Sequence, residues 1–250
     1  MAEWLGLPIV ASPQAADVSG AVLLLHGFML VVFVGWLVYF AYAVWRFRAH
    51  SRPPASRPVS AQLAVALVAV VTIYEIVELV AFALPAWNKR VDSVPDRDRA
   101  TVVRVVAEQF TWNVHYPGAD GRFGPTSADG VSPDNPLGVN WNDAASRDDL
   151  TTINQLNLPM GSPVLIELTS KDVIHSFTLA EMGVKQDAIP GRTSLVWFQP
   201  SRETPEEPSW EISCSQLCGL GHYRMRGFYR IMDPTAFTAW MEEERLLAGH

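Results

Sequence analysis

The chain has 250 residues, enough for one or two domains, and 49% of them are hydrophobic. Its formal net charge is −7, which gives no indication of a nucleic-acid partner. The first 88 residues contain four acidic and four basic side chains, so the whole net charge belongs to the part that follows them.

Two long apolar runs near the N-terminus predict membrane-spanning helices. Residues 21–47 carry no charge before Arg46, and residues 61–87 carry only two acidic side chains. Each run exceeds the roughly 20 residues that a helix needs to cross a bilayer. The first run is too long for the apolar core of a signal peptide, and no lysine or arginine precedes it. We therefore expect a retained transmembrane hairpin over residues 21–88.

The segment between the two runs predicts the orientation of the hairpin. It holds no acidic residue and four arginines, namely Arg46, Arg48, Arg52 and Arg57. Basic loops remain on the cytoplasmic side of a membrane, so both termini are expected on the outer face, including an N-terminal segment of residues 1–20. We expect an integral protein with two spans in a bacterial plasma membrane, with its main domain in the periplasmic or extracellular space.

The acidic residues of the second run, Glu75 and Glu78, are three apart and therefore share one face of a helix. A charged side chain within the bilayer is costly and usually faces protein or water. Two interpretations stay open. The pair either takes part in proton uptake or contacts a polar residue of a neighbouring subunit, or it simply packs.

Beyond residue 88 the long apolar runs give way to short segments in which apolar and polar residues alternate. Four of these segments predict strands, over residues 101–116, 162–170, 192–199 and 225–232, and a shorter strand is expected around residues 210–213. Short strands without helical patterns between them favour a sandwich or a barrel. Residues 117–149 are rich in Gly, Pro, Asp and Asn, which predicts one long loop. Asp233 and Pro234 predict the start of a C-terminal helix over residues 235–250.

A cluster of soft metal ligands lies late in the chain. Cys214, Cys218, His222 and Met225 fall within twelve residues, and His175 lies upstream in an apolar segment. Thiolates, imidazoles and a thioether favour copper over magnesium or calcium, and a mononuclear blue-copper site needs only one thiolate. The second thiolate suggests two coppers that share both sulfurs.

Three other interpretations compete with a copper site. The two cysteines, which are the only ones in the chain, could form a disulfide, but residues four apart rarely have the required geometry. A zinc site could use both cysteines and both histidines, although Met225 would then have no role. His175 and Met225 could also be ordinary core residues.

The run CSQLCGLGHYRM, together with DVIHSF and GVKQDAIPGR, resembles subunit II of haem–copper cytochrome c oxidases. The resemblance extends from the first apolar run to about residue 232. It implies an α+β membrane protein, in which a two-helix transmembrane hairpin precedes a cupredoxin-like Greek-key β-sandwich over residues 89–234. It also implies a binuclear copper centre, CuA. One copper would be held by His175 and Met225, the other by His222 and the Gln216 carbonyl, and Cys214 and Cys218 would bridge them.

The same resemblance implies a function. The chain would be the electron-transfer subunit of a terminal oxidase, accepting electrons from cytochrome c, or from a subunit that carries cytochrome c. It would pass them to haem in catalytic subunit I, which assembles with further oxidase subunits. Oxygen would be reduced to water there, coupled to proton translocation, and not in this chain. The acidic charge after residue 88 would suit a basic donor.

Two residues depart from the family pattern. Phe110, in the stretch QFTW, stands where relatives have the tryptophan that receives the electron, so Trp112, Tyr116 and Trp141 become candidates for that step. Gln216 stands where relatives have a glutamate whose side chain supports an interface magnesium ion. Copper should tolerate this change because it uses only the backbone carbonyl, whereas the magnesium site stays open.

Two alternative functions share many of these features. A nitric oxide reductase could have a CuA-bearing small subunit of the same design. A membrane-anchored module that delivers copper could use the same ligands, but it would release copper readily instead of holding a stable binuclear centre.

Overall fold

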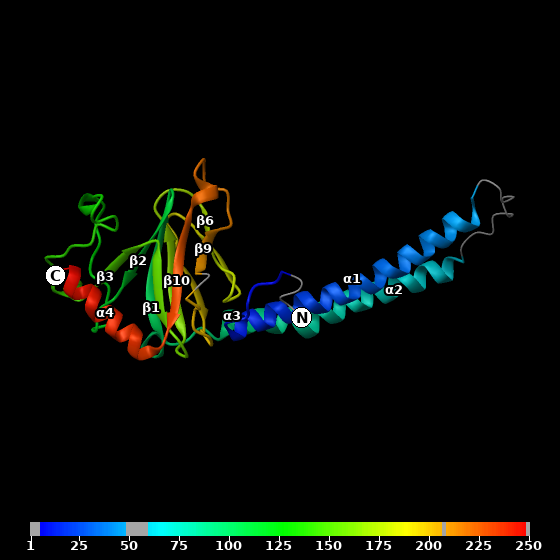
Figure 1. Cartoon of the computed structure of the whole chain (residues 1–250), viewed down its shortest axis with the longest axis horizontal. Coiled ribbons are helices and arrows are strands. Elements are labelled where there is room, and N and C mark those ends of the chain that lie inside the picture. The colour runs from blue at the N-terminus through cyan, green and yellow to red at the C-terminus, as the bar shows by residue number, and fades with distance from the viewer. Residues whose placement is uncertain (1–5, 49–59, 207–208, 249–250) are drawn as a thin grey trace. The chain divides into compact units, whose positions relative to one another are not determined.

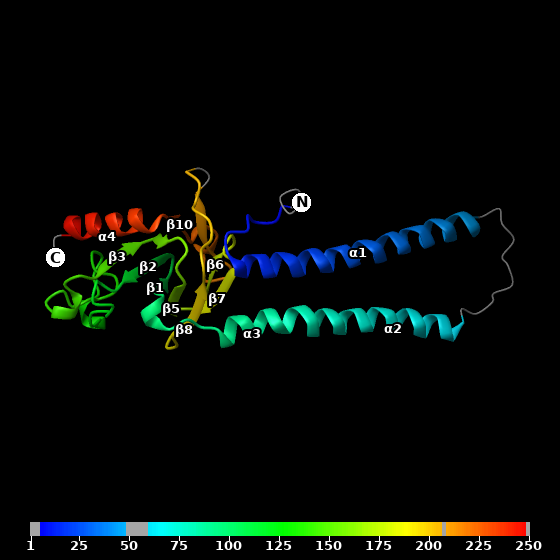
Figure 2. The same ribbon diagram turned by 90° about the horizontal axis from the view of Figure 1, so that it is seen from below.

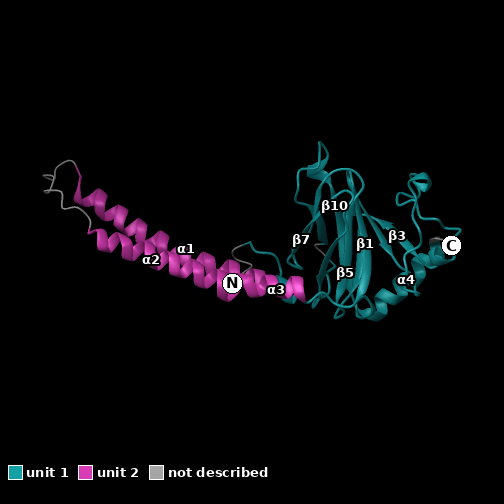
Figure 3. Ribbon diagram, turned by 180° about the vertical axis from the view of Figure 1, so that it is seen from behind, with its two compact units in different colours: residues 1–16, 93–250 teal, residues 17–92 magenta. Residues whose placement is uncertain are grey.

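The computed structural model describes residues 6–48, 60–206 and 209–248. The chain divides into two compact units, coloured separately in Figure 3. One unit comprises residues 17–92, and the other combines residues 1–16 with 93–250. Arg52 and Arg57, which belong to the expected cytoplasmic loop, lie outside the described residues.

The unit of residues 17–92 is helical, as the two apolar runs predict. Its elements are α1 (Pro13–Arg46), α2 (Ala61–Glu78), a π-helical turn (Leu79–Ala83) and α3 (Leu84–Asp92). The ring of Phe28 on α1 stacks on that of Tyr74 on α2, with centroids 3.6 Å apart, and the two helices run side by side in Figure 2. Both helical segments are long and apolar enough to cross a membrane, and their apolar side chains are largely exposed. This is what lipid-facing helices require.

The second unit is a sandwich of two five-stranded sheets (Figure 1). In chain order the strands are β1 (Thr101–Glu108), β2 (Thr111–Tyr116), β3 (Leu150–Ile153), β4 (Gln155–Pro159), β5 (Val164–Ser170), β6 (His175–Leu179), β7 (Val184–Ala188), β8 (Ser194–Phe198), β9 (Trp210–Cys214) and β10 (Arg226–Met232). One sheet has the order β3-β2-β1-β5-β8 and the other β4-β10-β9-β6-β7. Short 3-10 turns lie at Arg97–Arg99, Ala128–Gly130, Ala144–Ser146 and His222–Arg224.

The core of the sandwich is formed by apolar side chains at alternate positions along the strands. On β1, Val103, Val105 and Ala107 are fully buried, and on β5 the same holds for Val164, Ile166 and Leu168. These two strands pair in parallel, with Val105 opposite Leu168. Phe177 on β6 and Ile212 on β9 close the core from the other sheet. Period-two burial on both sheets is typical of a β-sandwich.

The four predicted strand segments are confirmed, with two differences. The segment 101–116 contains two antiparallel strands, β1 and β2, joined at Gln109 and Phe110. The short strands β3, β4, β6 and β7 lie outside the predicted segments, because stretches of four or five residues give too little alternation to be recognised. Strand β9 confirms the shorter strand expected around residues 210–213. The C-terminal helix α4 (Pro234–Ala248) is confirmed, and Asp233 Oδ1 accepts a hydrogen bond of 2.8 Å from the Thr235 backbone N–H.

The long loop of residues 117–149 is confirmed and is tied to the sandwich by a buried pair. His115 Nε2 on β2 lies 2.6 Å from Asp149 Oδ2, and both side chains are fully buried. Asp149 also accepts hydrogen bonds from the backbone N–H groups of Gly118 and Gly124. One carboxylate therefore joins both ends of the loop.

Residues before α1 also form part of the sandwich unit. The Ala11 backbone donates to the Glu181 carbonyl, and the Ser12 hydroxyl donates to the Met182 carbonyl over 2.7 Å. Gly183 then meets Ala15, which is 3% exposed. Gly183 has a φ of +64°, and a Cβ built there would lie 2.7 Å from the Ala15 Cα. Only glycine satisfies both conditions.

We expect the substitution Gly183→Ala to destabilise the sandwich unit. The left-handed backbone and the contact with Ala15 together should lower the free energy of unfolding by about 2–4 kcal/mol. Gly161→Ala is the matched control, because Gly161 has a φ of +84° but no atom within 4 Å of a built Cβ. Chemical unfolding of the full-length chain in detergent, followed by tryptophan fluorescence, measures both variants. Equal losses would show that the contact with Ala15 contributes nothing.

Candidate metal centre

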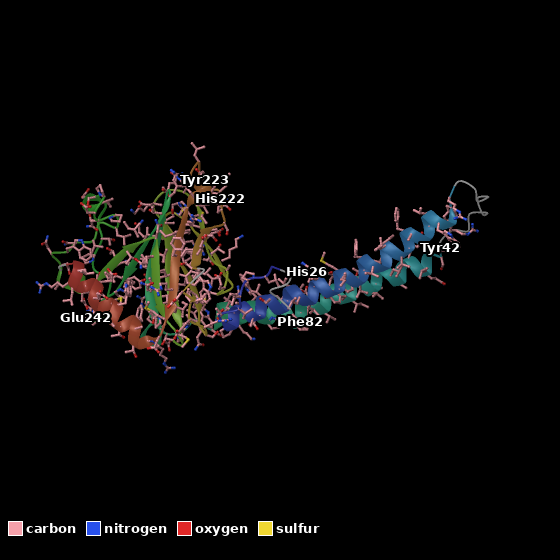
Figure 4. The ribbon with its side chains drawn as sticks, viewed as in Figure 1. His26, Tyr42, Phe82, His222, Tyr223 and Glu242 are labelled. Carbon is pink, nitrogen blue, oxygen red and sulfur yellow. The ribbon has the colours of Figure 1, made fainter. Side chains whose placement is uncertain are left out.

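The pairing of β6 with β9 places the candidate ligands at one end of the sandwich. Phe177 lies opposite Cys214 in this antiparallel pair, and the Ser215 backbone donates to the Ser176 carbonyl over 3.0 Å. His175, the first residue of β6, is thereby brought next to Cys214, the last residue of β9. The chain then loops through residues 215–225 and returns as β10, which pairs with β9. Figure 4 shows His222 and Tyr223 in this loop, at the tip of the sandwich unit.

The sulfur atoms lie at the centre of the cluster. The Cys218 Sγ atom is 3.8 Å from Cys214 Sγ, 3.6 Å from Met225 Sδ and 3.6 Å from His222 Nδ1. Cys214 Sγ is 3.2 Å from the Gln216 carbonyl oxygen. Cys218 and Met225 are almost fully buried, at 4% and 2% exposure. The structure therefore brings the soft donors of the loop together around Cys218.

His175 joins this group from β6 and is fully buried. Its Nδ1 atom is 3.1 Å from Met225 Sδ and 4.0 Å from Cys214 Sγ. Its Nε2 atom is 2.8 Å from a carboxylate oxygen of Asp172. With Nε2 donating to Asp172, Nδ1 faces the sulfurs and, once deprotonated, is the atom that would bind a metal. Metal-binding histidines commonly have such a carboxylate partner.

The donor set fits soft metal ions. His175, Cys214 and Cys218 have ligand atoms that all lie within 4.8 Å of one another, and His222 adds a nitrogen next to Cys218. Both cysteines are free thiols, and their separation of 3.8 Å is far longer than a disulfide bond of about 2.05 Å. The Met225 sulfur points into the cluster. A zinc site of two cysteines and two histidines would give Met225 no role. Two thiolates, two imidazoles and a thioether suit copper.

The two thiols have different acidities in the metal-free chain. Burial raises the pKa of Cys214, but hydrogen bonds from His175 and nearby backbone groups outweigh it and lower that pKa to about 6. Burial, together with the charge of Cys214, raises the pKa of Cys218 to about 11. Burial lowers the pKa of His175, yet Cys214 and Asp172 raise it more, so its pKa lies above the usual range.

Two residues near the ligands were not recognised as part of the site from the sequence. Asp172, which bonds His175, lies three residues before it, and this spacing in KDVIH was the available signal. Gln109 donates from its side-chain Nε2 to the Cys218 carbonyl over 2.5 Å and from its backbone to Asp172 over 2.7 Å. It directly precedes Phe110 in the stretch QFTW, where the family resemblance points only to the aromatic position.

The aromatic candidates for receiving the electron differ in position. Trp112 is fully buried and meets the His175 ring edge-on, with centroids 6.1 Å apart. Tyr116 is 1% exposed, and Trp141 packs on a separate small cluster under the long loop. In the loop of residues 215–225, called the ligand loop below, Tyr223 is 85% exposed and directly follows His222.

Known proteins are similar to this chain in sequence. A family described as "Cytochrome C oxidase subunit II, periplasmic domain" matches residues 101–228. The alternative cytochrome c oxidase subunit 2 of Bradyrhizobium diazoefficiens is 33% identical over 220 residues, which cover 87% of this chain and 76% of that protein. The cytochrome c oxidase subunit 2 of Cereibacter sphaeroides is 31% identical over 248 residues, covering 93% and 79%.

A solved structure is also similar. The periplasmic domain of subunit II of cytochrome oxidase from Bradyrhizobium japonicum has 28% sequence identity and a TM-score of 0.43, and the match covers 61% of this chain and 96% of that one. A superposition this loose adds nothing to the fold described above.

A β-sandwich with a soft-ligand cluster at one end, on a chain with two helices long and apolar enough to cross a membrane, is the architecture of a membrane protein with a candidate site for a soft metal ion. Given the matching sequence over residues 101–228 and relatives above 30% identity, this chain belongs to the cytochrome c oxidase subunit II family. It is therefore the electron-transfer subunit of an oxidoreductase complex, as the resemblance implies. The expected fold class is confirmed by the two helices and the sandwich.

We expect the two thiols of the metal-free chain to react at different pH. Cys214 should gain reactivity towards iodoacetamide as the pH rises through about 6, whereas Cys218 should stay unreactive until the pH approaches about 11. Mass spectrometry of the peptide that carries each cysteine measures the two rates. In His175→Ala the reactivity of Cys214 should shift to higher pH, because the main partner of its thiolate is lost. A single shared transition near pH 9 would contradict this interpretation.

Proposed function

We propose that the cluster holds a binuclear copper centre of the CuA type. The observation that carries the proposal is that all six ligands implied by the sequence resemblance converge at one end of the sandwich. They are His175, Cys214, the Gln216 carbonyl, Cys218, His222 and Met225. When bound, such a centre would accept and release one electron at a time, shared between the two copper ions.

The contacts support a division of the ligands into two sets. The His175 Nδ1 atom and Met225 Sδ are 3.1 Å apart, so they would serve the same copper. His222 Nδ1 lies 3.6 Å from Cys218 Sγ, and the Gln216 carbonyl oxygen lies 3.2 Å from Cys214 Sγ, so these two would serve the second copper. Both sulfurs would bridge. This division rests on the positions of the donor atoms.

The protein supplies a site that is assembled by the sandwich. His175, Cys218 and Met225 are buried, which limits the access of water, and strands β6, β9 and β10 fix the ends of the ligand segments. Ligands on rigid elements move little when the charge of the centre changes. Small movement favours fast electron transfer.

Magnesium is not included in the proposed cofactor set. The Gln216 side chain is exposed and carries an amide where the family resemblance implies a carboxylate. Magnesium prefers carboxylate oxygens and water.

The proposed partners are an electron donor and an electron acceptor. A donor, cytochrome c or a subunit that carries it, would deliver electrons to the sandwich unit, whose excess acidic charge would attract a basic protein. A haem-bearing catalytic subunit would receive them, and the exposed segment around His222, Arg224 and Arg226 is the proposed point of exit. Other oxidase subunits would complete the complex in which oxygen is reduced and protons are translocated.

The proposed location is a bacterial plasma membrane with the sandwich unit on the outer face. The two apolar helices and the match to a periplasmic domain support it. The orientation rests on the arginines between the helices, of which Arg46 and Arg48 belong to the described residues. Roles of Glu75 and Glu78 in proton uptake or subunit contact remain predictions.

Neither alternative function is favoured. The relatives described above carry the name cytochrome c oxidase subunit 2, which does not favour a nitric oxide reductase subunit. A copper delivery module needs accessible ligands, whereas His175 and Met225 are buried.

We expect the purified full-length chain with copper to give a seven-line electron paramagnetic resonance spectrum, from one electron shared between two coppers. Cys218→Ser should remove this pattern and lower the copper content, because Cys218 Sγ lies within 4 Å of three other ligand atoms. Met160→Leu, a matched sulfur change away from the cluster, should keep the wild-type spectrum. A four-line mononuclear spectrum from the wild-type chain would rule out the bridged centre.

We expect electron input from a basic cytochrome c to slow as salt is added. The acidic charge of the sandwich unit should raise the association rate at low ionic strength, and screening should reduce it by about tenfold or more between low and high salt. Stopped-flow oxidation of reduced cytochrome c by the assembled oxidase measures this. An uncharged small-molecule reductant serves as the control. Salt-independent kinetics with cytochrome c would exclude electrostatic steering.

A further inference from the structure

The turn between β1 and β2 lies across both segments that carry the ligands. This turn consists of Gln109 and Phe110. On one side it contacts Asp172, which precedes His175, and on the other side it contacts the loop that follows Cys218. β1, β6 and β9 belong to two different sheets, so the turn links the sheets at the ligand end of the sandwich.

Gln109 makes one hydrogen bond to each segment. Its backbone N–H donates to Asp172 Oδ2 over 2.7 Å, and Asp172 Oδ1 accepts from His175 Nε2 over 2.8 Å. Its side-chain Nε2 donates to the Cys218 carbonyl over 2.5 Å. A single residue therefore connects the partner of one ligand histidine to the backbone of a ligand cysteine.

The ligand loop passes close beneath this turn. A Cβ built on Gly219 would lie 2.6 Å from Gln109 Nε2, and one built on Gly221 would lie 2.5 Å from the Phe110 ring. Neither position accepts a larger residue without movement of the turn. The approach of the loop to the turn is thus as close as the backbone allows, and it places the Gln109 amide within reach of the Cys218 carbonyl.

We propose that Gln109 is a positioning residue for the metal centre: its side-chain amide holds the Cys218 segment at a fixed distance from His175. The proposal deepens the proposed function and rests on it for the copper-dependent part. Gln109 is itself exposed, so its side chain adds little to the core, and its bonds are directed at the ligand segments. Its backbone bond to Asp172 does not depend on the side chain, which allows the link to Cys218 to be removed alone.

The position of Gln109 also relates the centre to the surface. The exposed side chain lies beside the half-buried Phe110, so a donor that touches this turn touches the residue that holds Cys218. A substitution of Gln109 should therefore alter the positions of the ligands, and this change should in turn alter the rate of electron transfer.

The first test uses the metal-free full-length chain. Gln109→Met keeps the length of the side chain and removes its amide, so the Cys218 segment should open more often. The rate of alkylation of the buried Cys218 thiol at fixed pH should rise about fivefold, the change expected from the loss of one ordinary hydrogen bond. Gln199→Met is the matched control, because the Gln199 amide makes a similar bond of 2.8 Å to the Gly161 carbonyl, away from the ligand segments. It should leave the Cys218 rate unchanged.

The second test uses the copper-loaded chain. Gln109→Met should retain copper but change the hyperfine splitting and the reduction potential of the centre, and Gln109→Glu should change them further, because a carboxylate would face the Cys218 carbonyl. Gln199→Met should change neither. Wild-type values of the alkylation rate, spectrum and potential in Gln109→Met would overturn the positioning role while leaving the proposed function intact. A wild-type chain without a two-copper spectrum would overturn the proposed function, and the metal-free alkylation rates would then decide the positioning role alone.

Discussion

The geometry of the ligand cluster depends on the antiparallel pairing of β6 with β9. His175 and Cys214 are 39 residues apart in sequence, and this pairing brings the His175 Nδ1 atom to 4.0 Å from the Cys214 sulfur. A slip of one residue would turn Cys214 to the opposite face of the sheet. The next strand fixes the other end of the ligand loop, because Arg226 on β10 lies opposite Ser213 on β9. Hydrogen-bonded strands therefore hold both ends of the ligand loop.

Hydrogen bonds between elements then refine what the strands assemble. Asp172 accepts hydrogen bonds from His175 and from the Gln109 backbone. Burial alone would raise the pKa of Asp172, but these bonds outweigh burial, so the pKa lies below its usual value. An ionised carboxylate at this point keeps the imidazole oriented with Nδ1 towards the sulfurs. The glycines of the ligand loop complete the arrangement, because they permit a close approach to Gln109 and Phe110. The ligands are therefore oriented by groups that do not themselves touch a metal.

The surface around the cluster combines two kinds of chemistry. The ligand loop exposes large apolar side chains at its tip, with Leu217, Leu220 and Tyr223 exposed by 75%, 98% and 85%. The excess negative charge after residue 88 belongs to the rest of the same unit and its connections. Apolar surface is typical of the centre of lasting interfaces, whereas dispersed charge acts mainly on the rate of encounter.

The sequence determined the two long apolar helices, the main strands and the candidate metal ligands, because these depend on long apolar runs, period-two alternation and donor spacing within one segment. Tertiary structure decided the short strands β3, β4, β6 and β7, whose stability comes from their neighbours and not from their own pattern. It also decided the roles of Asp172 and Gln109, and the burial of Trp112 against His175. Contacts such as these join residues from different strands, and their distances are set only when the two sheets pack. The local sequence therefore predicts which residues are candidate ligands, whereas long-range packing determines which groups orient them.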